Sequence, residues 1–457
     1  MSRDTTINSG NPESPRRALV LSGGGSRGGY EIGVWQAMKE LGMDIDIVTG
    51  TSVGAINAAM VCVGDLKLAK KLWRDVETNM VFDLDNESRY DEAKEEIVKN
   101  TRGFMGMPVA EALSYAKYTV TRGGAGSSGL LGIMQDNLDV EAFYDSPVEY
   151  GLVTAELPAF KGRFLYKEDI PEDKICEYLV ASASCFPAAH FTVIDGKKLV
   201  DGGYSDNLPI DMAIEKGATQ IVAVNMEAIG VVKKESLKRA EELPGGFTYI
   251  TSKWDLGNFL CFDPETNRRN MALGYLDALK AFGQKDGIWY TFEKGCIPSK
   301  AIRRADCAAR IFDLDPLNIY TRQKNSDLSG AGVSGSAVSE NDPAASLSND
   351  PTDIPTADLN EELTAAVRTA EKQYLKSKEL LEKRASKLLS GSITSGITRT
   401  LRSTLSPQVL TVIIAHDFKE KEGQSAFLNK HFISRFSSEV LAASYIKGEG
   451  LISDDLV

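Results

Sequence analysis

Residues 45–63 read IDIVTGTSVGAINAAMVCV, and this stretch decides the fold class. Ile45 to Val48 is a short apolar run, which predicts a buried strand. Val53 to Val63 is built from small and apolar residues, which predicts a helix packed closely on a sheet. Ser52 stands at the sharp turn between them. Strand, turn and helix at this spacing are typical of a parallel sheet covered by helices.

Ser52 is the centre of a Gly-x-Ser-x-Gly pattern, with Gly50 before it and Gly54 after it. A serine in such a turn has strained backbone angles, and only glycine at the two flanking positions avoids a clash. The turn lifts the hydroxyl clear of the sheet, at the positive end of the following helix, whose field favours a developing alkoxide. The pattern in this setting predicts a nucleophilic serine.

A second glycine-rich stretch, Gly23-Gly24-Gly25-Ser26-Arg27-Gly28, follows an apolar run from Ala18 to Ser22 that predicts another strand. Glycines leave backbone N–H groups free to point at one spot, and the helix that begins at Gly28 adds its dipole. One interpretation is an oxyanion hole for a tetrahedral intermediate, with Arg27 adding positive field. The candidate residues for it are Gly23, Gly24, Gly25 and Arg27, with Gly28 as support for the motif.

The same glycines also satisfy G-x-G-x-x-G, the pattern of a dinucleotide pyrophosphate cradle. A cradle predicts an acidic residue at the end of the next strand, where it would hold a ribose. That strand instead ends in Val48-Thr49-Gly50 and runs into the serine turn. The sequence therefore favours the oxyanion hole.

A third motif, Asp201-Gly202-Gly203, follows the apolar run from Lys198 to Val200. The commoner use of Asp-Gly is a turn. The functional interpretation is a catalytic carboxylate at a strand end, with glycine allowing a substrate to approach. Asn207 and Pro209 follow in a pattern that would start the next helix.

The histidines decide between a triad and a dyad. A Ser-His-Asp hydrolase needs a positioned imidazole, and in the usual α/β-hydrolase order the histidine follows the acid. His190 precedes Asp201, while His416 and His431 lie beyond a predicted linker. A Ser52–Asp201 dyad needs fewer assumptions, and Asp201 must then be partly buried or bonded directly to Ser52 to act as a base.

The chain has 457 residues and a formal net charge of −12, which gives no general attraction to nucleic acid, so no nucleic-acid partner is expected. Six scattered cysteines form no C-x-x-C pair, so neither a metal site nor a redox motif is predicted, and no cofactor is expected. The N-terminus lacks the apolar segment of a secretory signal. The longest apolar run, Val409 to Ala415, is strand-sized rather than long enough to span a bilayer. We expect a cytoplasmic protein, peripheral to the membrane if the basic segment described below docks.

The composition divides the chain as follows. We predict a disordered N-terminus over 1–17, a catalytic domain over 18–312 with its core motifs in 18–226, a disordered linker over 325–360, and a mainly helical region over 361–457. Thr101 to Asp136 mixes apolar residues with glycines, which fits either a pair of helices with a loop or an apolar lid. Residues 368–402 carry nine basic and three acidic side chains. That segment is either a solvated helix face or a docking site for an anionic membrane.

Taken in order, the motifs Gly23–Gly28, Gly50–Gly54 and Asp201–Gly203 resemble the three signatures of the patatin-like phospholipase family. The resemblance covers about Ala18 to Met226, and Trp254–Gly283 is similar to a bacterial branch of the family. The third motif reads Asp-Gly-Gly rather than Asp-Gly-Ala, which lies within the family's range.

The resemblance implies an α/β fold of three layers, α/β/α, with a mostly parallel central sheet, followed here by a C-terminal helical appendage. It implies a Ser52–Asp201 dyad, an oxyanion site at Gly24 and Gly25 near Arg27, and hydrolysis of fatty acyl esters without a metal. Two other classes stay open: a nucleotide-binding protein that uses the Gly23–Gly28 loop, and a non-catalytic interaction protein that works through its tail.

Overall fold

A computed structural model describes residues 15–82, 126–186, 188–322, 354–385, 405–420, 425–428 and 430–453. Side chains at 376–385, 426 and 431 are outside that description. The chain divides into two compact units, with unit 1 ending at Ala281 and unit 2 beginning at Phe282. Each unit is described by itself.

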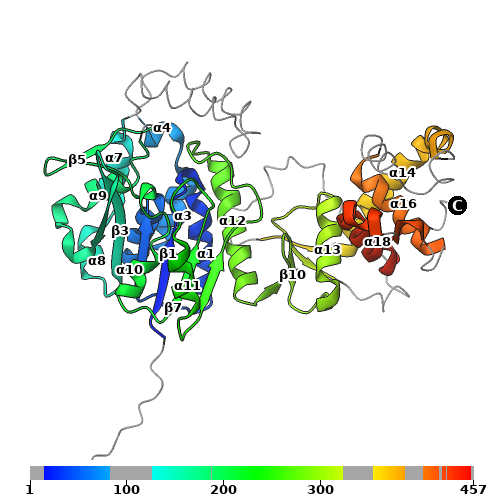
Figure 1. Cartoon of the computed structure of the whole chain (residues 1–457), viewed down its shortest axis with the longest axis horizontal. Helices are drawn as coiled ribbons and strands as arrows, with labels where there is room; N and C mark the ends of the chain where they lie inside the picture. Colours follow the sequence, from blue (N-terminus) through cyan, green and yellow to red (C-terminus); the bar gives the residue numbers. More distant parts are fainter. Residues whose placement is uncertain are drawn as a thin grey trace, which may run out of the picture. The chain divides into compact units, whose positions relative to one another are not determined.

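Unit 1 is built on an eight-stranded sheet, whose central strands are parallel (Figure 1). The strand order is β5-β6-β3-β2-β1-β7-β8, with β4 paired to β3. The parallel strands are β1 (Arg17–Leu21), β2 (Ile47–Thr51), β3 (Glu149–Glu156), β7 (Gln220–Val224) and β8 (Phe247–Ile250). The antiparallel strands are β4 (Lys161–Tyr166), β5 (Thr192–Ile194) and β6 (Lys197–Asp201).

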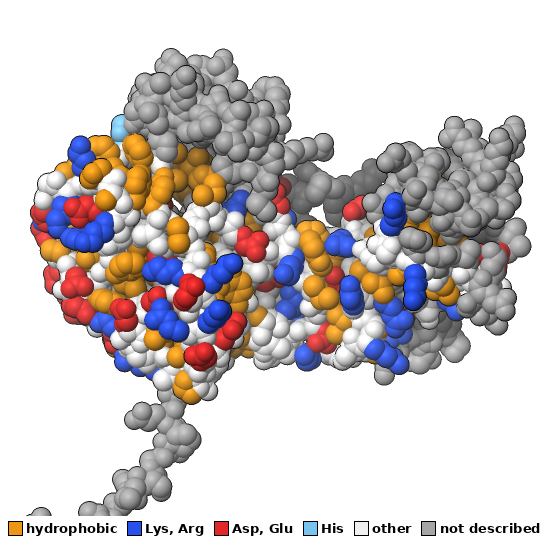
Figure 2. All heavy atoms as spheres, viewed as in Figure 1, with side chains coloured by type: hydrophobic (Ala, Val, Ile, Leu, Met, Phe, Trp, Pro, Cys, Tyr) orange, Lys and Arg blue, Asp and Glu red, His pale blue; other side chains and the backbone are white. Residues whose placement is uncertain are grey.

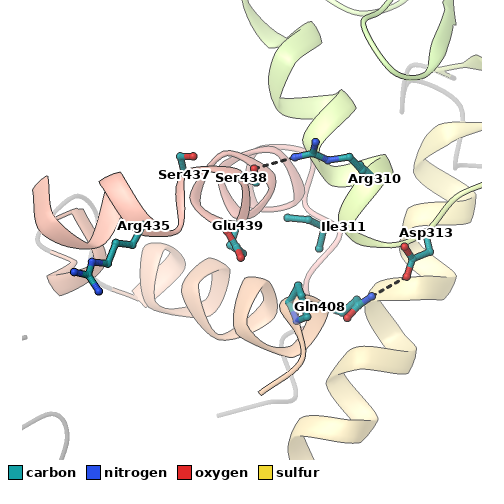
Figure 3. A pocket seen from close by; sticks show the side chains of 9 residues that line it. Arg310, Ile311, Asp313, Gln408, Arg435, Ser437, Ser438 and Glu439 are labelled. Carbon is teal, nitrogen blue, oxygen red and sulfur yellow. Dashed lines mark hydrogen bonds between the residues drawn. The ribbon is translucent and has the colours of Figure 1, made fainter. Parts of the chain in front are cut away.

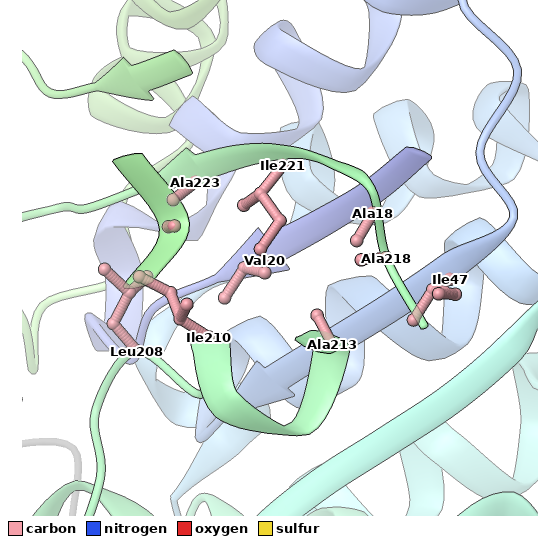
Figure 4. Close-up of a cluster of buried hydrophobic side chains, with 10 residues drawn as sticks. Ala18, Val20, Ile47, Leu208, Ile210, Ala213, Ala218, Ile221 and Ala223 are labelled. Carbon is pink, nitrogen blue, oxygen red and sulfur yellow. The ribbon is translucent and has the colours of Figure 1, made fainter. Parts of the chain in front are cut away.

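Helices cover both faces of this sheet, as expected for strands that are apolar on both sides. On one face, α10 (Ile210–Glu215) and α11 (Lys234–Glu241) enclose a cluster of buried side chains that includes Val20, Ile221 and Ala213 (Figure 4). On the other face, α2 (Val53–Val63) packs against β1, β2 and β3. The predicted α/β class with a mostly parallel central sheet is confirmed.

Two long helices lie side by side on the α2 side, α1 (Gly29–Glu40) and α12 (Pro264–Ala281). They approach closely because each presents a glycine at the contact. A Cβ on Gly33 would lie 1.9 Å from the Met271 carbonyl oxygen, and one on Gly274 would lie 1.9 Å from that of Tyr30. The remaining described helices of unit 1 are η1 (Gly25–Gly28), α3 (Leu66–Asp75), α4 (Thr78–Val81), α7 (Ser128–Asn137), α8 (Val140–Asp145), η2 (Lys167–Asp169), η3 (Glu172–Lys174), α9 (Ile175–Ser182) and η4 (Gly202–Tyr204).

Unit 2 combines a small sheet with a group of helices. The sheet has the order β12-β11-β10-β9, in which only the β9–β10 pair is antiparallel among the described strands. The strands are β9 (Lys285–Asp286), β10 (Thr291–Glu293), β11 (Ile319–Thr321) and β12 (Thr356–Asp358). The helices are α13 (Ser299–Ile311), α14 (Leu359–Ala385), α16 (Pro407–Glu420), η6 (Ala426–Leu428), α17 (Lys430–Arg435) and α18 (Ser437–Gly448).

A polar pocket of about 490 Å³ lies among the unit 2 helices (Figure 3). Its lining includes Arg310, whose guanidinium donates to the Ser438 hydroxyl at 3.0 Å, and Gln408, which donates to Asp313 at 2.9 Å. Arg435 and Glu439 bring one further charge of each sign. Because charges of both signs line the pocket, the lining does not indicate a particular class of ligand.

Several predicted boundaries differ from the observed ones. β1 begins at Arg17, inside the segment predicted to be disordered, and the unit boundary falls at 281/282 rather than near 312. The predicted linker ends too late, because Thr356–Asp358 pairs with β11 and α14 starts at Leu359. Val409–Ala415 is part of helix α16 rather than a strand, since seven apolar residues fit either element.

Two predicted features lie partly or wholly outside the described residues. Of the candidate lid, 101–125 are outside, and the rest contains α7. Of the basic segment 368–402, residues 386–402 lie outside the described residues, and at 376–385 only the backbone of α14 is described. Among the described helices, none is long and apolar enough to cross a membrane.

Candidate active site

β2 and β6 pair with neighbouring stretches of β3, and this pairing brings the ends of β2 and β6 together. Thr51, the last residue of β2, pairs with Val153, and Asp201, the last residue of β6, pairs with the next residue, Thr154. Because β4 occupies the opposite edge of β3, β2 and β6 share one edge. β2 runs parallel to β3 and β6 antiparallel, so their carboxyl ends meet head-on. Ser52 and Asp201 come together there.

Ser52 occupies the turn between β2 and α2 in a left-handed conformation, with φ 58° and ψ −131°. The two motif glycines make that turn sterically possible. A Cβ on Gly50 would lie 2.2 Å from the Gly54 carbonyl oxygen, and one on Gly54 would lie 2.5 Å from the Ser22 carbonyl oxygen. Both obstacles are backbone atoms, so no side chain can move aside.

A second serine fixes the backbone of the first. The Ser52 N–H donates to the Ser182 hydroxyl at 2.9 Å, and that hydroxyl donates to the Val153 carbonyl at 2.6 Å. Ser182 is fully buried at the end of α9. The strained turn is therefore tied to β3 as well as to its own helix.

Asp201 is buried, with 8 % of its surface exposed, and its carboxylate accepts a hydrogen bond from the Gly203 N–H at 2.8 Å. Burial raises the pKa of Asp201 to about 6, although its interactions with the Ser52 hydroxyl and with the Gly203 N–H both lower it. A carboxylate near this pKa is a stronger base than an ordinary aspartate and stays ionised at neutral pH.

The two glycines after Asp201 have different surroundings. A Cβ on Gly202 would lie 2.2 Å from the Val153 carbonyl oxygen, so no side chain fits there. At Gly203 a Cβ would lie 3.0 Å from Asn207 Oδ1 and 3.1 Å from Asp201 Oδ1. The second position is thus also crowded, but by side chains that belong to the site.

Asn207 connects the glycine loop to the Asp201 loop. The Gly23 N–H donates to the Asn207 carbonyl at 3.2 Å, and Asn207 Nδ2 donates to the Gly23 carbonyl at 3.3 Å. Gly23 also lies beside the nucleophile, because a Cβ there would be 3.0 Å from the Ser52 Cβ. Its N–H is therefore engaged, although the sequence made it a candidate oxyanion donor.

The next two glycines of the loop differ from Gly23. In the described part of the chain, neither the Gly24 nor the Gly25 N–H donates to a backbone acceptor. Gly25 has φ 56°, and a Cβ there would lie 1.9 Å from the Phe259 carbonyl oxygen. The loop passes so close to its neighbours that glycine is required, and its two N–H donors directly follow Gly23, the glycine that lies next to Ser52.

Arg27 spans this loop and two others. Its guanidinium donates to the Gly257 carbonyl at 2.9 Å and to the Met226 carbonyl at 3.2 Å. These bonds hold the loops after β7 and β8 against the glycine loop. The sequence predicted positive field from Arg27, and these contacts give it an anchoring role as well.

A buried polar network lies beneath the glycine loop. Asn57 Nδ2 donates to Glu31 at 2.8 Å and to the Gly28 carbonyl at 3.0 Å, and the Trp73 indole donates to Asn57 Oδ1 at 2.8 Å. Burial raises the pKa of Glu31 well above its usual range, although the hydrogen bonds from Asn57 and from the Ser22 backbone lower it. The network ties α1, α2 and α3 together below Ser52.

The other candidate groups lie elsewhere. His190 is exposed, and the His416 ring lies 3.4 Å from Glu371 inside unit 2. The side chain of His431 is outside the described residues. Burial, and then the nearby charge of Asp201, raises the pKa of the Cys185 thiol to about 12, which keeps it protonated. In the described residues, no group of three or more His, Cys, Asp and Glu side chains is arranged to hold a metal ion.

The sequence motifs named Ser52, Asp201 and the glycines, which the fold brings together, but did not indicate Ser182 or the bridging role of Asn207. Ser182 stands in a run of small residues, Val180-Ala181-Ser182-Ala183-Ser184, where nothing distinguishes one serine from the other. Asn207 was interpreted only as the start of a helix. Ser182 and Asn207 both contact residues that are distant in the sequence, and a local sequence pattern cannot predict such contacts.

Comparison with known proteins gives a match over part of the chain. Residues 19–214 match the family model of the patatin-like phospholipases. The chain is 25 % identical over 250 residues to patatin-like phospholipase domain-containing protein 7 of Rattus norvegicus, 29 % over 217 residues to protein 6 of that series in Homo sapiens, and 26 % over 268 residues to lysophospholipase nte1 of Aspergillus terreus. These matches cover 52 %, 46 % and 58 % of this chain but only 15 %, 13 % and 15 % of the relatives.

Two solved structures are also similar in outline. VipD from Legionella pneumophila aligns over 97 % of this chain and 92 % of that one, with 14 % identity and a TM-score of 0.37. The type III effector ExoU aligns over 95 % and 78 %, with 14 % identity and a TM-score of 0.29. By this sequence match, residues 19–214 form a patatin-like phospholipase domain.

Proposed function

We propose that this protein is a serine hydrolase that cleaves fatty acyl esters of lipids through a Ser52–Asp201 dyad. The observation that carries the proposal is that Ser52, at the end of β2, meets a buried Asp201, at the end of β6, and that the Ser52 hydroxyl is among the groups that set the pKa of Asp201, which is raised to about 6. The names of the relatives, phospholipase and lysophospholipase, support a lipid substrate.

The first half of the reaction forms an acyl-enzyme. Asp201 accepts the Ser52 proton while the serine oxygen attacks the ester carbonyl. The N–H groups of Gly24 and Gly25 stabilise the oxyanion, and the dipole of α2 adds to the field. The intermediate collapses as the C–O bond to the alcohol breaks, and the alcohol leaves with the proton from Asp201.

In the second half, Asp201 takes a proton from a water molecule, which attacks the acyl-enzyme and releases the fatty acid. Ser52 regains its proton from Asp201. Ser182 keeps the Ser52 N–H engaged throughout, so oxyanion stabilisation depends on the glycine loop. Neither half uses a metal or an organic cofactor.

The test is a lipid-panel hydrolysis assay. Phosphatidylcholine, lysophosphatidylcholine, a triacylglycerol and a soluble short-chain ester are offered to the wild type and to Ser52→Ala. We expect release of fatty acid by the wild type from at least one member and none by Ser52→Ala.

Labelling by a fluorophosphonate probe separates the other two classes. A non-catalytic interaction protein would leave Ser52 unlabelled. Saturable binding of a dinucleotide, competing with that label, would instead favour a nucleotide site at the glycine loop.

A further inference from the structure

Five large apolar side chains stand in solvent next to the Asp201 loop, and we call them the apolar rim. They are Phe160, Phe164, Tyr204, Ile229 and Val231, with exposed fractions from 39 % to 71 %. In the view of Figure 2, hydrophobic side chains are exposed on the upper part of unit 1 and charged side chains are more frequent on its lower part. Apolar groups gathered in this way on a surface mark a contact surface more often than chance exposure does.

The rim is attached to the candidate catalytic loop by short connections. Tyr204 directly follows Gly203 in the chain. The Val231 N–H donates to the Gly203 carbonyl at 2.9 Å, and the Asn207 N–H donates to the Val231 carbonyl at 2.6 Å. The rim therefore borders the site at which Asp201 and Asn207 act.

Phe160 belongs to the rim because it packs on Tyr204, with the ring centroids 4.8 Å apart. It lies in the turn between β3 and β4 with φ 49°, a left-handed conformation that is costly for a bulky side chain. Phe160 nevertheless remains 39 % exposed, so the burial that would offset this strain is incomplete. Because packing within the fold does not offset the backbone strain at Phe160, we expect the exposed ring to have a function.

Phe164 adds a cationic partner to the rim. The Lys233 ammonium lies 4.8 Å from the centroid of the Phe164 ring and 2.7 Å from the buried carboxylate of Asp206. An aromatic ring with an ammonium over its face matches the boundary between acyl chains and headgroups, where an apolar body and a polar end are both satisfied.

We propose that the apolar rim is the surface by which unit 1 docks on a phospholipid bilayer. This inference rests on the proposed lipid hydrolase function, because it places the site at the layer that holds the substrate. The chain is acidic overall, with a net charge of −12, so the rim binds by inserting apolar side chains rather than by charge. Binding should therefore extend to zwitterionic lipid and persist at high salt.

The test uses the full chain with Ser52→Ala, so that the vesicles stay intact, and phosphatidylcholine vesicles in 0.5 M NaCl. The rim variant is Phe160→Asn with Ile229→Asn, since both side chains are exposed and asparagine tolerates the left-handed conformation of Phe160. The matched control is Ile288→Asn with Leu428→Asn, two side chains of unit 2 that are each 43 % exposed. We expect the rim variant to lose about tenfold or more in vesicle partitioning, while the control binds like its parent.

The same rim variant with Ser52 intact separates this proposal from the proposed function. It should hydrolyse a soluble short-chain ester at the wild-type rate and lose activity only on vesicles. Equal vesicle binding by rim variant and parent would overturn the docking proposal, as would a change in self-association without a change in vesicle binding. Rim-dependent vesicle binding by a wild type that cleaves no ester would contradict the hydrolase function and leave the docking surface in place.

Discussion

Ser182 holds the backbone of Ser52 through its hydroxyl oxygen, which accepts the Ser52 N–H at 2.9 Å. Ser182→Ala would leave that N–H buried without its acceptor, at a cost of about 1–3 kcal/mol in the free energy of unfolding. It would also loosen the nucleophile, and we expect kcat/KM on a soluble ester to fall roughly tenfold to a hundredfold.

Ser184→Ala is the matched control, because its buried hydroxyl bonds to the Val180 carbonyl and to Thr192 rather than to the nucleophile. The two variants are compared by steady-state kinetics and by urea unfolding. Wild-type kcat/KM in a folded Ser182→Ala protein would show that Ser182 does not position Ser52.

Activity should depend on the ionisation of Asp201. The base must be deprotonated, and burial raises the pKa of Asp201 to about 6. We therefore expect kcat/KM on a soluble ester to rise with pH through about 6 and to level off above it. A pH profile that is flat between pH 5 and 8 would exclude Asp201 as the base.

The same pKa has a consequence for stability. Asp201 binds its proton more tightly in the folded chain than in the unfolded chain, where the ordinary value is 3.8. The stability that this provides is complete below pH 3.8 and is lost as the pH rises through about 6.

Asp201→Asn removes this dependence. We expect the variant to be more stable than the wild type at pH 8 by up to about 3 kcal/mol, with the difference shrinking toward pH 4. Urea unfolding at the two pH values measures it. A variant that is less stable than the wild type at pH 8 would contradict the burial of an ionised carboxylate.

The fold and the core of the candidate site were largely predictable from the sequence, because both are encoded locally. The strands and helices around Ser52 follow from apolar runs, and the glycines follow from turns that admit no Cβ. The antiparallel pairing of β4, β5 and β6 was not predicted, since pairing direction depends on long-range register. That register is what brings Asp201 to Ser52.

Glycine is also sterically required at the serine turn. A Cβ on Gly54, in α2, would lie 2.5 Å from the carbonyl oxygen of Ser22, which directly follows β1. We expect Gly54→Ala to cost at least about 3 kcal/mol in the free energy of unfolding, or to prevent folding.

Gly132→Ala is the control for that substitution. It lies in helix α7, and nothing stands within 4 Å of the position of its Cβ. Alanine there should leave stability unchanged or raise it by about 0.5–1 kcal/mol. Thermal unfolding compares the two variants, and equal melting temperatures would show that the serine turn is less crowded than the contacts imply.

The basic segment 368–402 makes a separate prediction about membranes. Deleting the tail would not test it cleanly, because Leu363 and Val367 are fully buried in unit 2. Replacing Lys376, Lys378, Lys383 and Arg384 together by glutamine removes charge alone. We expect weaker binding to phosphatidylglycerol vesicles at low salt and no difference at 0.5 M NaCl. Unchanged binding at low salt would assign the segment to a solvated helix face.

The central claim is that Asp201, and no histidine, serves Ser52 as its base. Its most direct test is the rate of ester hydrolysis by Asp201→Asn and His416→Ala beside the wild type, with folding checked for each. The account predicts that Asp201→Asn loses hydrolysis, by at least about a thousandfold, while His416→Ala keeps the wild-type rate on a soluble ester. Retained activity in Asp201→Asn together with its loss in His416→Ala would contradict the dyad and establish a triad.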